Sequence, residues 1–573
     1  MQLLRKLIKH HNFWPLLVVV AFGLLAGKGL FGPGYFNMHD DLQMMRQLEM
    51  EKCFLDLQIP CRWVQDMGYG FGFPLFNFYP PLPYLIGEIF RVFGISFVDT
   101  AKNLFILSFV TSGISMYWLA KNFFGRFGGV VSAIFYVWAP YHAVDVYVRG
   151  AMNEAWALIW FPLILLFIYK IIKEKKKVFN LMIGLALSLF GLLTSHNLMV
   201  LIFAPVAGAW SLIWLIKEKS WRRVAHLIAA GIFAIGLSAF FTLPVLVEQK
   251  FVQTETLVKG YYEYVAHFAT ISQLLISRFW GYGPSVWLEG DGMSFQLGHV
   301  HWILSLLVGG LIVYKFIKTR KFDYFLVPSA FLLTVGWFAA FMTHLKSVFI
   351  WQAIPPLAYV QFPWRFLTLV ILGFSFIAGS LTNLLPKKIS YVAAVGLVAL
   401  LLVLNWNYFT VQNGKLGALT DTEKFSAAAW DLQQTAGIYD YLPKYAVTAP
   451  KEPQGKGGLT EVMRGQAKVT NPYQKSNFAS FDVDVTDAES QIRVGIFKFD
   501  GWRAYVDGRE TEIYVPEEEQ WGRSWIKVTG GVHKITFKFA NTPIRTIGNA
   551  ISIASWLLLP ALIIWRKRLS FLA

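Results

Sequence analysis

The stretch "NMHDDLQMM" (37–45) brings three ionisable side chains, His39, Asp40 and Asp41, to a point where an apolar run of the chain ends. Two interpretations of the carboxylates are open. One carboxylate can cap the helix predicted to follow, because Asp40 precedes Gln43 by three residues, as in a capping box. Neighbouring helical side chains point about 100° apart. The other carboxylate is then free to face a cavity, where it is a candidate for catalysis.

A second polar set lies in "YHAVDVYVRGAMNEAW" (141–156), between two apolar runs. Asp145, Arg149 and Glu154 all fall close to the predicted membrane surface. Ionisable groups at membrane depth are costly and usually serve a function. The structural alternative is an Arg149–Glu154 ion pair that only closes the turn.

Two further candidates start or end apolar runs. His196, in "TSHN" (194–197), suits either a hydrogen bond at a helix end or a ligand to phosphate or metal. Arg365 follows Gln361 and Trp364 in "YVQFPWRFL" (359–367). Such an arginine is either a snorkelling anchor or a clamp for a lipid phosphate. The loop 245–298 is rich in aromatic residues that suit either sugar stacking or interfacial anchoring: Tyr261, Tyr262, Tyr264, Trp280, Tyr282 and Trp287.

Composition defines the elements that must position these residues. The 573 residues are 55% hydrophobic and 15% charged, whereas soluble domains carry about 25% charged residues. Together with the long apolar runs, this predicts an α-helical multi-pass membrane protein. The net charge of +17 lies in short clusters between the apolar runs, which favours lipid head groups and topology over a nucleic-acid partner.

Seven basic clusters, from Arg5–Lys9 to Arg566–Arg568, predict the orientation if all of them are cytoplasmic. An even number of spans then separates neighbouring clusters, and both termini are cytoplasmic. The first apolar run lacks a cleavage site and is predicted to be retained. The segment 79–94 carries Glu88 and Arg91 and is predicted to lie in the outer interface. The twelve predicted spans are 13–31, 98–120, 127–145, 154–172, 178–194, 198–216, 224–244, 299–316, 323–342, 364–384, 389–408 and 546–565.

The outer side then receives loop 32–97, with interfacial helices, and a domain at 410–545. The second half of this domain alternates as strands do, and Asp507-Gly508 and Gly530-Gly531 are hairpin signals. The prediction is a β-sandwich-like outer domain between a membrane domain (1–409) and a last span with a basic tail (546–573). Cys53 and Cys61 lie in the outer loop, as a disulfide or as two free thiols.

Several motifs together resemble the bacterial membrane proteins labelled "6-pyruvoyl-tetrahydropterin synthase-related", which are similar to the GT-C superfamily of glycosyltransferases. The likeness covers nearly the whole chain, and its motifs identify a family more than an activity. They are His39-Asp40, "CRW" (61–63), "GYGFGFPLFNFYPPLPY" (68–84), "VRGAMNEAW" (148–156), "SHN" (195–197), "QFPWRFL" (361–367), "GWRAYVDGRE" (501–510) and "GGVHKITFKF" (530–539).

The resemblance implies a GT-C-like fold and an inverting transfer of sugar from a polyprenyl-phosphate donor. The acceptor would be a glycan, lipid or protein, and the site would face the extracytoplasmic side of the plasma membrane. It implies catalytic roles for Asp40, Asp41 and Glu154. The substrate-binding residues would be His39, Arg62, Asp145, Arg149, His196, Gln361 and Arg365.

No cofactor is required by this reaction, although a divalent metal at His39, Asp40 and Asp41 is compatible with it. Two other functions stay open. A lipid or polysaccharide transporter tends to carry charges deep in mid-span and paired inverted repeats. A non-catalytic membrane scaffold for cell-surface polymer assembly would tolerate alanine at the acidic positions.

Overall fold

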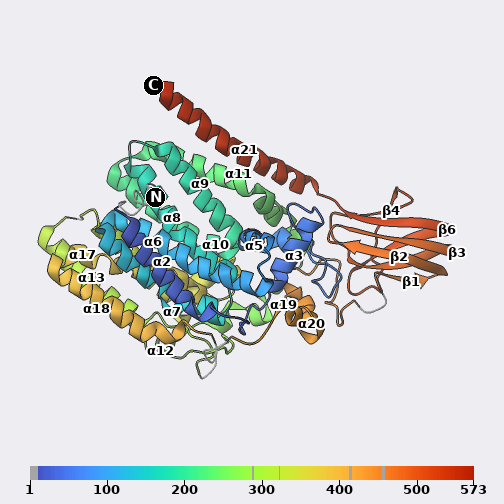
Figure 1. Ribbon diagram of the computed structural model, residues 1–573, viewed down its shortest axis with the longest axis horizontal. Helices are drawn as coiled ribbons and strands as arrows, with labels where there is room; N and C mark the ends of the chain where they lie inside the picture. Colours follow the sequence, from blue (N-terminus) through green and yellow to red (C-terminus); the bar gives the residue numbers. More distant parts are fainter. Residues whose placement is uncertain (1–10, 287–289, 322, 412–415, 455–457, 573) are drawn as a thin grey trace. The chain divides into compact units, whose positions relative to one another are not determined.

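A computed structural model describes the chain except for residues 1–10, 287–289, 322, 412–415, 455–457 and 573 (Figure 1). The predicted basic cluster Arg5–Lys9 and Trp287 lie outside the described residues. The chain forms two compact units, each built from three segments. The first unit comprises Met1–Gln43, Val98–Ala234 and Val258–Leu419, and the second comprises Met44–Phe97, Ile235–Leu257 and Thr420–Ala573.

Long apolar helices make up most of the first unit (Figure 1). Three of them, α6, α8 and α16, are the most buried, with 67–83% of their apolar windows covered, whereas α18 is 22% covered and lies at the edge. The helices α14 and α16 approach closely at Gly373, where a Cβ atom would overlap the carbonyl of Leu332. The helices are α2 (Phe13–Ala26), α6 (Phe97–Val137), α8 (Met152–Lys173), α9 (Val178–Ser195), α10 (Asn197–Glu218), α13 (His299–Thr319), α14 (Leu326–Met342), α16 (Leu367–Ala378) and α18 (Lys387–Asn405).

Ten helices in the described part of the chain are long and apolar enough to cross a membrane, as in a multi-pass membrane protein. The difference from the twelve predicted spans has two causes. The predicted spans 98–120 and 127–145 both fall largely on α6, a 41-residue helix broken by the non-helical backbone of Gly125 (φ 71°, ψ −177°). The predicted span 323–342 corresponds to α14, which has 17 residues. The count of twelve therefore stays a prediction.

The second unit begins with the short helices of the predicted outer loop. Helix α3 (Gln43–Leu55) belongs to the loop predicted to carry interfacial helices, yet its polar residues Arg46, Gln47 and Glu49 are buried. Gln47 Nε2 donates to Glu88 Oε1 at 2.5 Å on α5 (Leu82–Val92). Helix α5 has 11 residues and is not among the candidate spans, which agrees with the prediction that the segment 79–94 does not cross the membrane. Cys53 and Cys61 form a disulfide.

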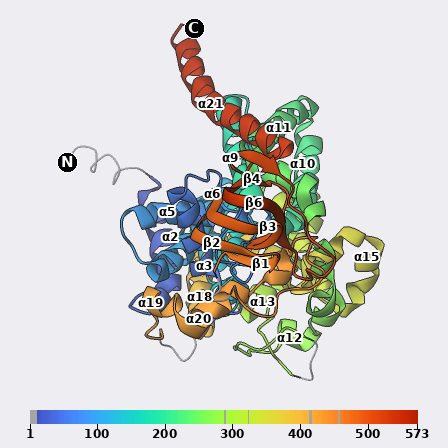
Figure 2. The same ribbon diagram turned by 90° about the vertical axis from the view of Figure 1, so that its right-hand side faces the viewer.

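The sheet of the second unit has six antiparallel strands in the order β1-β3-β6-β4-β5, with β2 also paired to β3 (Figure 2). Strands β3 and β6 are the long central pair, joined from Phe478↔Lys538 to Phe497↔Arg523. The long final helix α21 (Pro543–Leu572) follows the sheet. The strands are β1 (Thr460–Arg464), β2 (Ala467–Lys475), β3 (Phe478–Phe497), β4 (Trp502–Val506), β5 (Arg509–Thr511) and β6 (Arg523–Phe539).

Two details of the predicted β domain are corrected. The described strands belong to one hydrogen-bonded sheet where the sequence predicted a sandwich-like arrangement. Gly530-Gly531 is not a hairpin turn, because β6 runs through it and the register shifts there, opposite the break between Val485 and Glu489. Asp507-Gly508 does form the predicted β4–β5 hairpin, with positive φ at both residues, as this tight turn requires.

Candidate functional site

A π-helical turn, Val144–Val148, positions the first site residues of the first unit. Such turns widen the backbone and are frequent at functional sites. The turn closes through a hydrogen bond from the Arg149 N–H to the Val144 carbonyl at 2.8 Å. Asp145 and Arg149 are thereby set facing each other, and Arg149 Nη1 pairs with Asp145 Oδ1.

Glu154, in the first turn of α8, is the centre of the site and is 1% exposed. Its Oε1 accepts a hydrogen bond from the Tyr141 hydroxyl at 2.7 Å. Its Oε2 lies 2.9 Å from Arg149 Nη1 and 3.5 Å from Arg365 Nε. A single buried carboxylate thus holds two guanidinium groups, which is the compensation that a buried charge needs.

Arg149 concentrates its contacts on one nitrogen. Nη1 contacts Asp145 and Glu154 and also donates to the Tyr141 hydroxyl at 3.1 Å. The guanidinium lies 4.4 Å from the centroid of the Trp364 ring. Burial lowers the pKa of Arg149, but Glu154, Tyr141 and Asp145 outweigh it and raise the pKa above its ordinary value. Within the described chain, no protein acceptor is bonded to its Nε or Nη2, so these donors remain for a ligand.

Arg365 reaches Glu154 from a strained turn. Gln361 has φ 65° and ψ −49°, and the Phe362 N–H donates to the Val360 carbonyl at 2.7 Å. This is a γ-turn with positive φ, a rare and costly conformation for a residue with a side chain. Arg365 Nη1 donates to the Val360 carbonyl at 2.8 Å and to Gln361 Oε1 at 3.0 Å. Among the described residues, none accepts a hydrogen bond from its Nη2.

His196 is the N-cap of α10. Its Nδ1 accepts from the Leu198 N–H at 3.2 Å, which leaves the proton of the neutral ring on Nε2. Nε2 lies 4.0 Å from Glu154 Oε2. Burial, and then the charge of Arg365, lower the pKa of His196 to about 3 against the opposing effect of Glu154. His196 is therefore neutral at physiological pH.

The segment that carries His39 and Asp40 rests on the loop after the π-helical turn. The main-chain N–H groups of His39 and Asp40 donate to the carbonyls of Val148 (3.0 Å) and Arg149 (2.8 Å). Gln43 Nε2 donates to the Gly150 carbonyl at 2.7 Å and to Asp40 Oδ2 at 3.0 Å. Asp40 and Gln43 therefore contact each other through their side chains, whereas the predicted capping box stays a prediction, and Asp40 lies beside the main chain of Arg149.

His39 also contacts the aromatic loop of the same unit. Its Nε2 lies 3.2 Å from the carbonyl of Tyr282, and the two rings meet edge to face. Burial lowers the pKa of His39, the bond to Tyr282 raises it, and the charge of Arg149 lowers it. The net effect holds the pKa of His39 below its ordinary value, chiefly because of burial.

The structure brings most of the predicted site residues together. Asp145, Arg149, His196 and Arg365 surround Glu154, and Gln361 holds Arg365. Asp41 follows Asp40 and is partly exposed. In the described segments, no group of three or more His, Cys, Asp or Glu side chains is placed to hold a metal ion, so His39, Asp40 and Asp41 do not form a ready metal site.

Arg62 belongs to the second unit and is bonded to protein groups there. It donates to Asn77 Oδ1 (3.3 Å), the Phe240 carbonyl (2.9 Å) and Asn549 Oδ1 (2.7 Å). Burial, and then the charge of Arg545, lower its pKa to about 9. These contacts give Arg62 a structural role, and its predicted substrate contact stays a prediction.

Sequence reasoning missed Tyr141 and the contribution of Trp364. Tyr141 joins Glu154 to Arg149, and the Trp364 ring covers the Arg149 guanidinium. Both lie inside stretches singled out for their charges. The hydroxyl of Tyr141 and the ring of Trp364 could have identified them as partners of Arg149, since buried guanidinium groups favour such neighbours.

No protein-family model and no curated protein matches the sequence. Solved structures of the oligosaccharyltransferase of Archaeoglobus fulgidus overlap with part of the chain. The apo form is 11% identical, covers 78% of this chain and 61% of its own, and has a TM-score of 0.43. The enzyme AglB in complex with an inhibitory peptide and a dolichol-phosphate is 10% identical with the same coverage and a TM-score of 0.44.

The complex with zinc and sulfate is 12% identical, covers 69% of this chain and 53% of its own, and has a TM-score of 0.38. This chain thus spans about 61% of the length of the first two structures. The name "6-pyruvoyl-tetrahydropterin synthase-related" has no support from these comparisons.

Proposed function

We propose that this protein is a membrane glycosyltransferase that moves a sugar from a polyprenyl-phosphate donor to an acceptor on the outer face of the membrane. One observation carries the proposal. The motifs at 148–156, 195–197 and 361–367, far apart in sequence, meet at Glu154. The His39-Asp40 motif is hydrogen-bonded to the same loop.

The chemistry of this meeting point suits a phosphate. Arg149 and Arg365 are held by one carboxylate and keep guanidinium donors for a further acceptor. Guanidinium groups bind phosphate oxygens in pairs of parallel hydrogen bonds. Fixed donors of this kind also stabilise the charge that grows on a leaving phosphate. His196 is neutral, so it adds an Nε2–H donor without a positive charge that would repel Arg149 and Arg365.

In the proposed reaction, Asp40 accepts the proton of an acceptor hydroxyl. The acceptor oxygen forms a bond to the anomeric carbon, and the bond from that carbon to the phosphate oxygen breaks. The lipid phosphate leaves with the electron pair, and Arg149 and Arg365 bind it. Attack opposite the leaving group inverts the anomeric centre. Glu154 acts as a positioning residue, since Oε1 accepts a hydrogen bond from Tyr141 and Oε2 forms ion pairs with the two arginines.

The test uses full-length protein in lipid nanodiscs and separates the role of Asp40 as a general base from the role of Arg365 in phosphate binding. Polyprenyl-phosphate-linked glucose, galactose, mannose and N-acetylglucosamine serve as donors, and polyprenyl phosphate alone serves as the binding probe. Asp40→Asn should lose transfer by at least 10²-fold, the usual contribution of a general base, while still binding the probe. Arg365→Gln should lose probe binding and transfer together.

Exposed residues provide matched controls: Asp431→Asn for the carboxylate and Arg222→Gln for the guanidinium. Both should behave as wild type. Full transfer by Asp40→Asn would remove Asp40 from the reaction. Unchanged probe binding by Arg365→Gln would remove the phosphate site and favour the transporter or scaffold function.

A further inference from the structure

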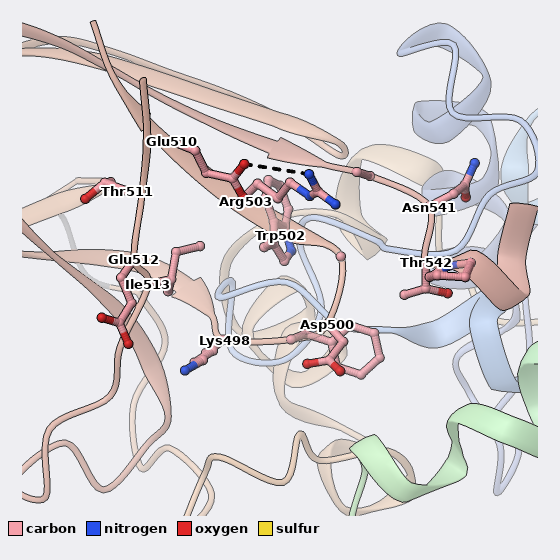
Figure 3. A pocket seen from close by; sticks show the side chains of 14 residues that line it. Lys498, Asp500, Trp502, Arg503, Glu510, Thr511, Glu512, Ile513, Asn541 and Thr542 are labelled. Carbon is pink, nitrogen blue, oxygen red and sulfur yellow. Dashed lines mark ion pairs between the residues drawn. The ribbon is translucent and has the colours of Figure 1, made fainter. Parts of the chain in front are cut away.

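The second unit contains a pocket of about 370 Å³ at the end of its sheet that faces α21 (Figure 3). The volume lies at the lower end of the usual range for ligand pockets, about 300–1,000 Å³. Three stretches line it: the connection before β4 (498–501), the β4–β5 hairpin and the residues after it (502–503 and 510–513), and the link from β6 to α21 (540–543). All belong to the second unit, so the pocket is complete within that unit.

Side chains of both charges line the pocket. Carboxylates come from Asp500, Glu510 and Glu512, and Lys498 and Arg503 supply positive charge. Arg503 pairs with Glu510 at 3.7 Å, as the dashed line in Figure 3 shows. After this pairing, one lysine faces two carboxylates. The remaining charge is slightly negative, which disfavours phosphates and other anions.

Trp502 adds a donor without a protein acceptor. The residue is 7% exposed, and its Nε1–H is buried with no hydrogen-bond partner among the described residues. A buried polar group left unpaired is costly. The ring is held from behind by Trp63 and Phe539, with centroids 5.8 and 5.4 Å away.

We infer that this pocket binds a neutral saccharide. Each sugar hydroxyl both donates and accepts hydrogen bonds, so it suits a small site that mixes carboxylates, hydroxyls, an amide and an ammonium group. The pocket has room for roughly one or two sugar rings. The hydroxyls of Thr511 and Thr542 and the amide of Asn541 complete the set.

The sugar has two possible sources, a soluble glycan or the head group of a lipid. The pocket includes Pro543, the first residue of the candidate membrane span Pro543–Ile564. A lipid-borne sugar therefore needs to rise only a short way from the bilayer to enter. The inference does not depend on Asp40 or on transfer, because none of the pocket residues belongs to the first unit.

The test measures binding by full-length protein in nanodiscs. One arm titrates soluble oligosaccharides of glucose, galactose, mannose and N-acetylglucosamine. A second arm places a neutral glycolipid in the nanodisc. Asp500→Asn replaces charge-assisted hydrogen bonds with neutral ones and should weaken binding about tenfold. Glu512→Gln changes an exposed pocket carboxylate, so it should weaken binding in the same way and leave folding unchanged. Glu518→Gln, an exposed residue outside the pocket lining, is the matched control and should bind as wild type.

Tighter binding in one arm identifies the source of the sugar. No binding in either arm, or equal affinity of wild type, Asp500→Asn and Glu512→Gln, would overturn the inference. Sugar phosphates or simple amines that bind tenfold tighter than neutral sugars would also overturn it. Asp40→Asn should keep saccharide binding, so failure of the proposed transfer and failure of this pocket are distinguishable.

Discussion

Glu154 is the residue on which the candidate site depends. It holds Arg149 and Arg365 together and is itself held by Tyr141. Removing one member of a buried ion pair leaves the others uncompensated. A substitution of Glu154 therefore tests whether the ionic cluster of Glu154, Arg149 and Arg365 stabilises the protein.

We expect Glu154→Gln to destabilise the protein by about 3–5 kcal/mol, the usual cost of breaking a buried pair. Thermal unfolding of the purified protein in detergent measures the effect. Asp431→Asn changes an exposed carboxylate in the same way and should leave the unfolding temperature unchanged. A variant of Glu154 as stable as wild type would mean that the arginines do not need this counter-charge.

The second prediction at the residue scale concerns His196 and the pH dependence of stability. Its pKa of about 3 in the folded protein lies below the ordinary value of about 6.5. The unfolded chain therefore binds more protons at acidic pH, so the contribution of His196 is fully present above about pH 6.5 and is lost as the pH falls toward 3.

His196→Asn keeps a good N-cap and removes the titration. The unfolding temperature of wild type should fall more steeply between pH 7.5 and pH 5 than that of the variant. Parallel slopes would show that His196 does not resist protonation in the folded state.

At the scale of elements, the site depends on how the 38–43 segment rests on the loop after the π-helical turn. Gly150 has φ 60°, and a Cβ atom there would collide with the side chain of Met38. The same loop offers the carbonyls of Val148, Arg149 and Gly150 to this segment. The glycine therefore fixes where Asp40 lies.

Gly150→Ala should lower transfer activity and the unfolding temperature together, because it adds both a clash and an unfavourable backbone conformation. Gly208→Ala is the matched control, since Gly208 lies within α10 with open space around its Cβ position. It should be neutral or slightly stabilising. An active, stable Gly150→Ala protein would contradict the close packing of these two segments.

Sequence patterns predicted much at this scale. Hydropathy located most long helices, and turn chemistry located the Asp507-Gly508 hairpin. The hairpin predicted at Gly530-Gly531 was wrong because glycine pairs also occur inside strands at register shifts.

The sequence predicted only part of the candidate site. Charged residues at helix ends marked Arg149, Glu154 and Arg365. The link from Tyr141 to Glu154 joins residues of separate elements, so the pattern of charges alone did not identify it.

At the scale of the whole molecule, the orientation in the membrane is the open prediction. The prediction that all seven basic clusters are cytoplasmic places the cluster Lys173–Lys177, which includes Lys176, in the cytoplasm and the sheet outside. A disulfide between Cys53 and Cys61 fits an oxidising outer compartment for their loop.

Lys176→Cys and Lys468→Cys, each in a Cys53→Ser/Cys61→Ser background, test this orientation, because both lysines are exposed. A membrane-impermeant maleimide applied to intact cells should label Lys468→Cys alone, and both variants should be labelled after permeabilisation. Labelling of Lys176→Cys in intact cells would reverse the topology.

The second unit is assembled from segments that leave the ribosome at widely separated times. Residues 44–97 are made early, whereas 420–573 come last, with most of the membrane helices synthesised in between. At translation rates of about 5–20 residues per second, the early segment waits some tens of seconds for its partners. During that interval Trp63 lacks the rings of Phe499, Trp502 and Phe539, against which it packs in the folded unit. Biogenesis of this protein therefore demands either a holding chaperone or shelter by the nascent membrane bundle, and slowed translation should increase its degradation.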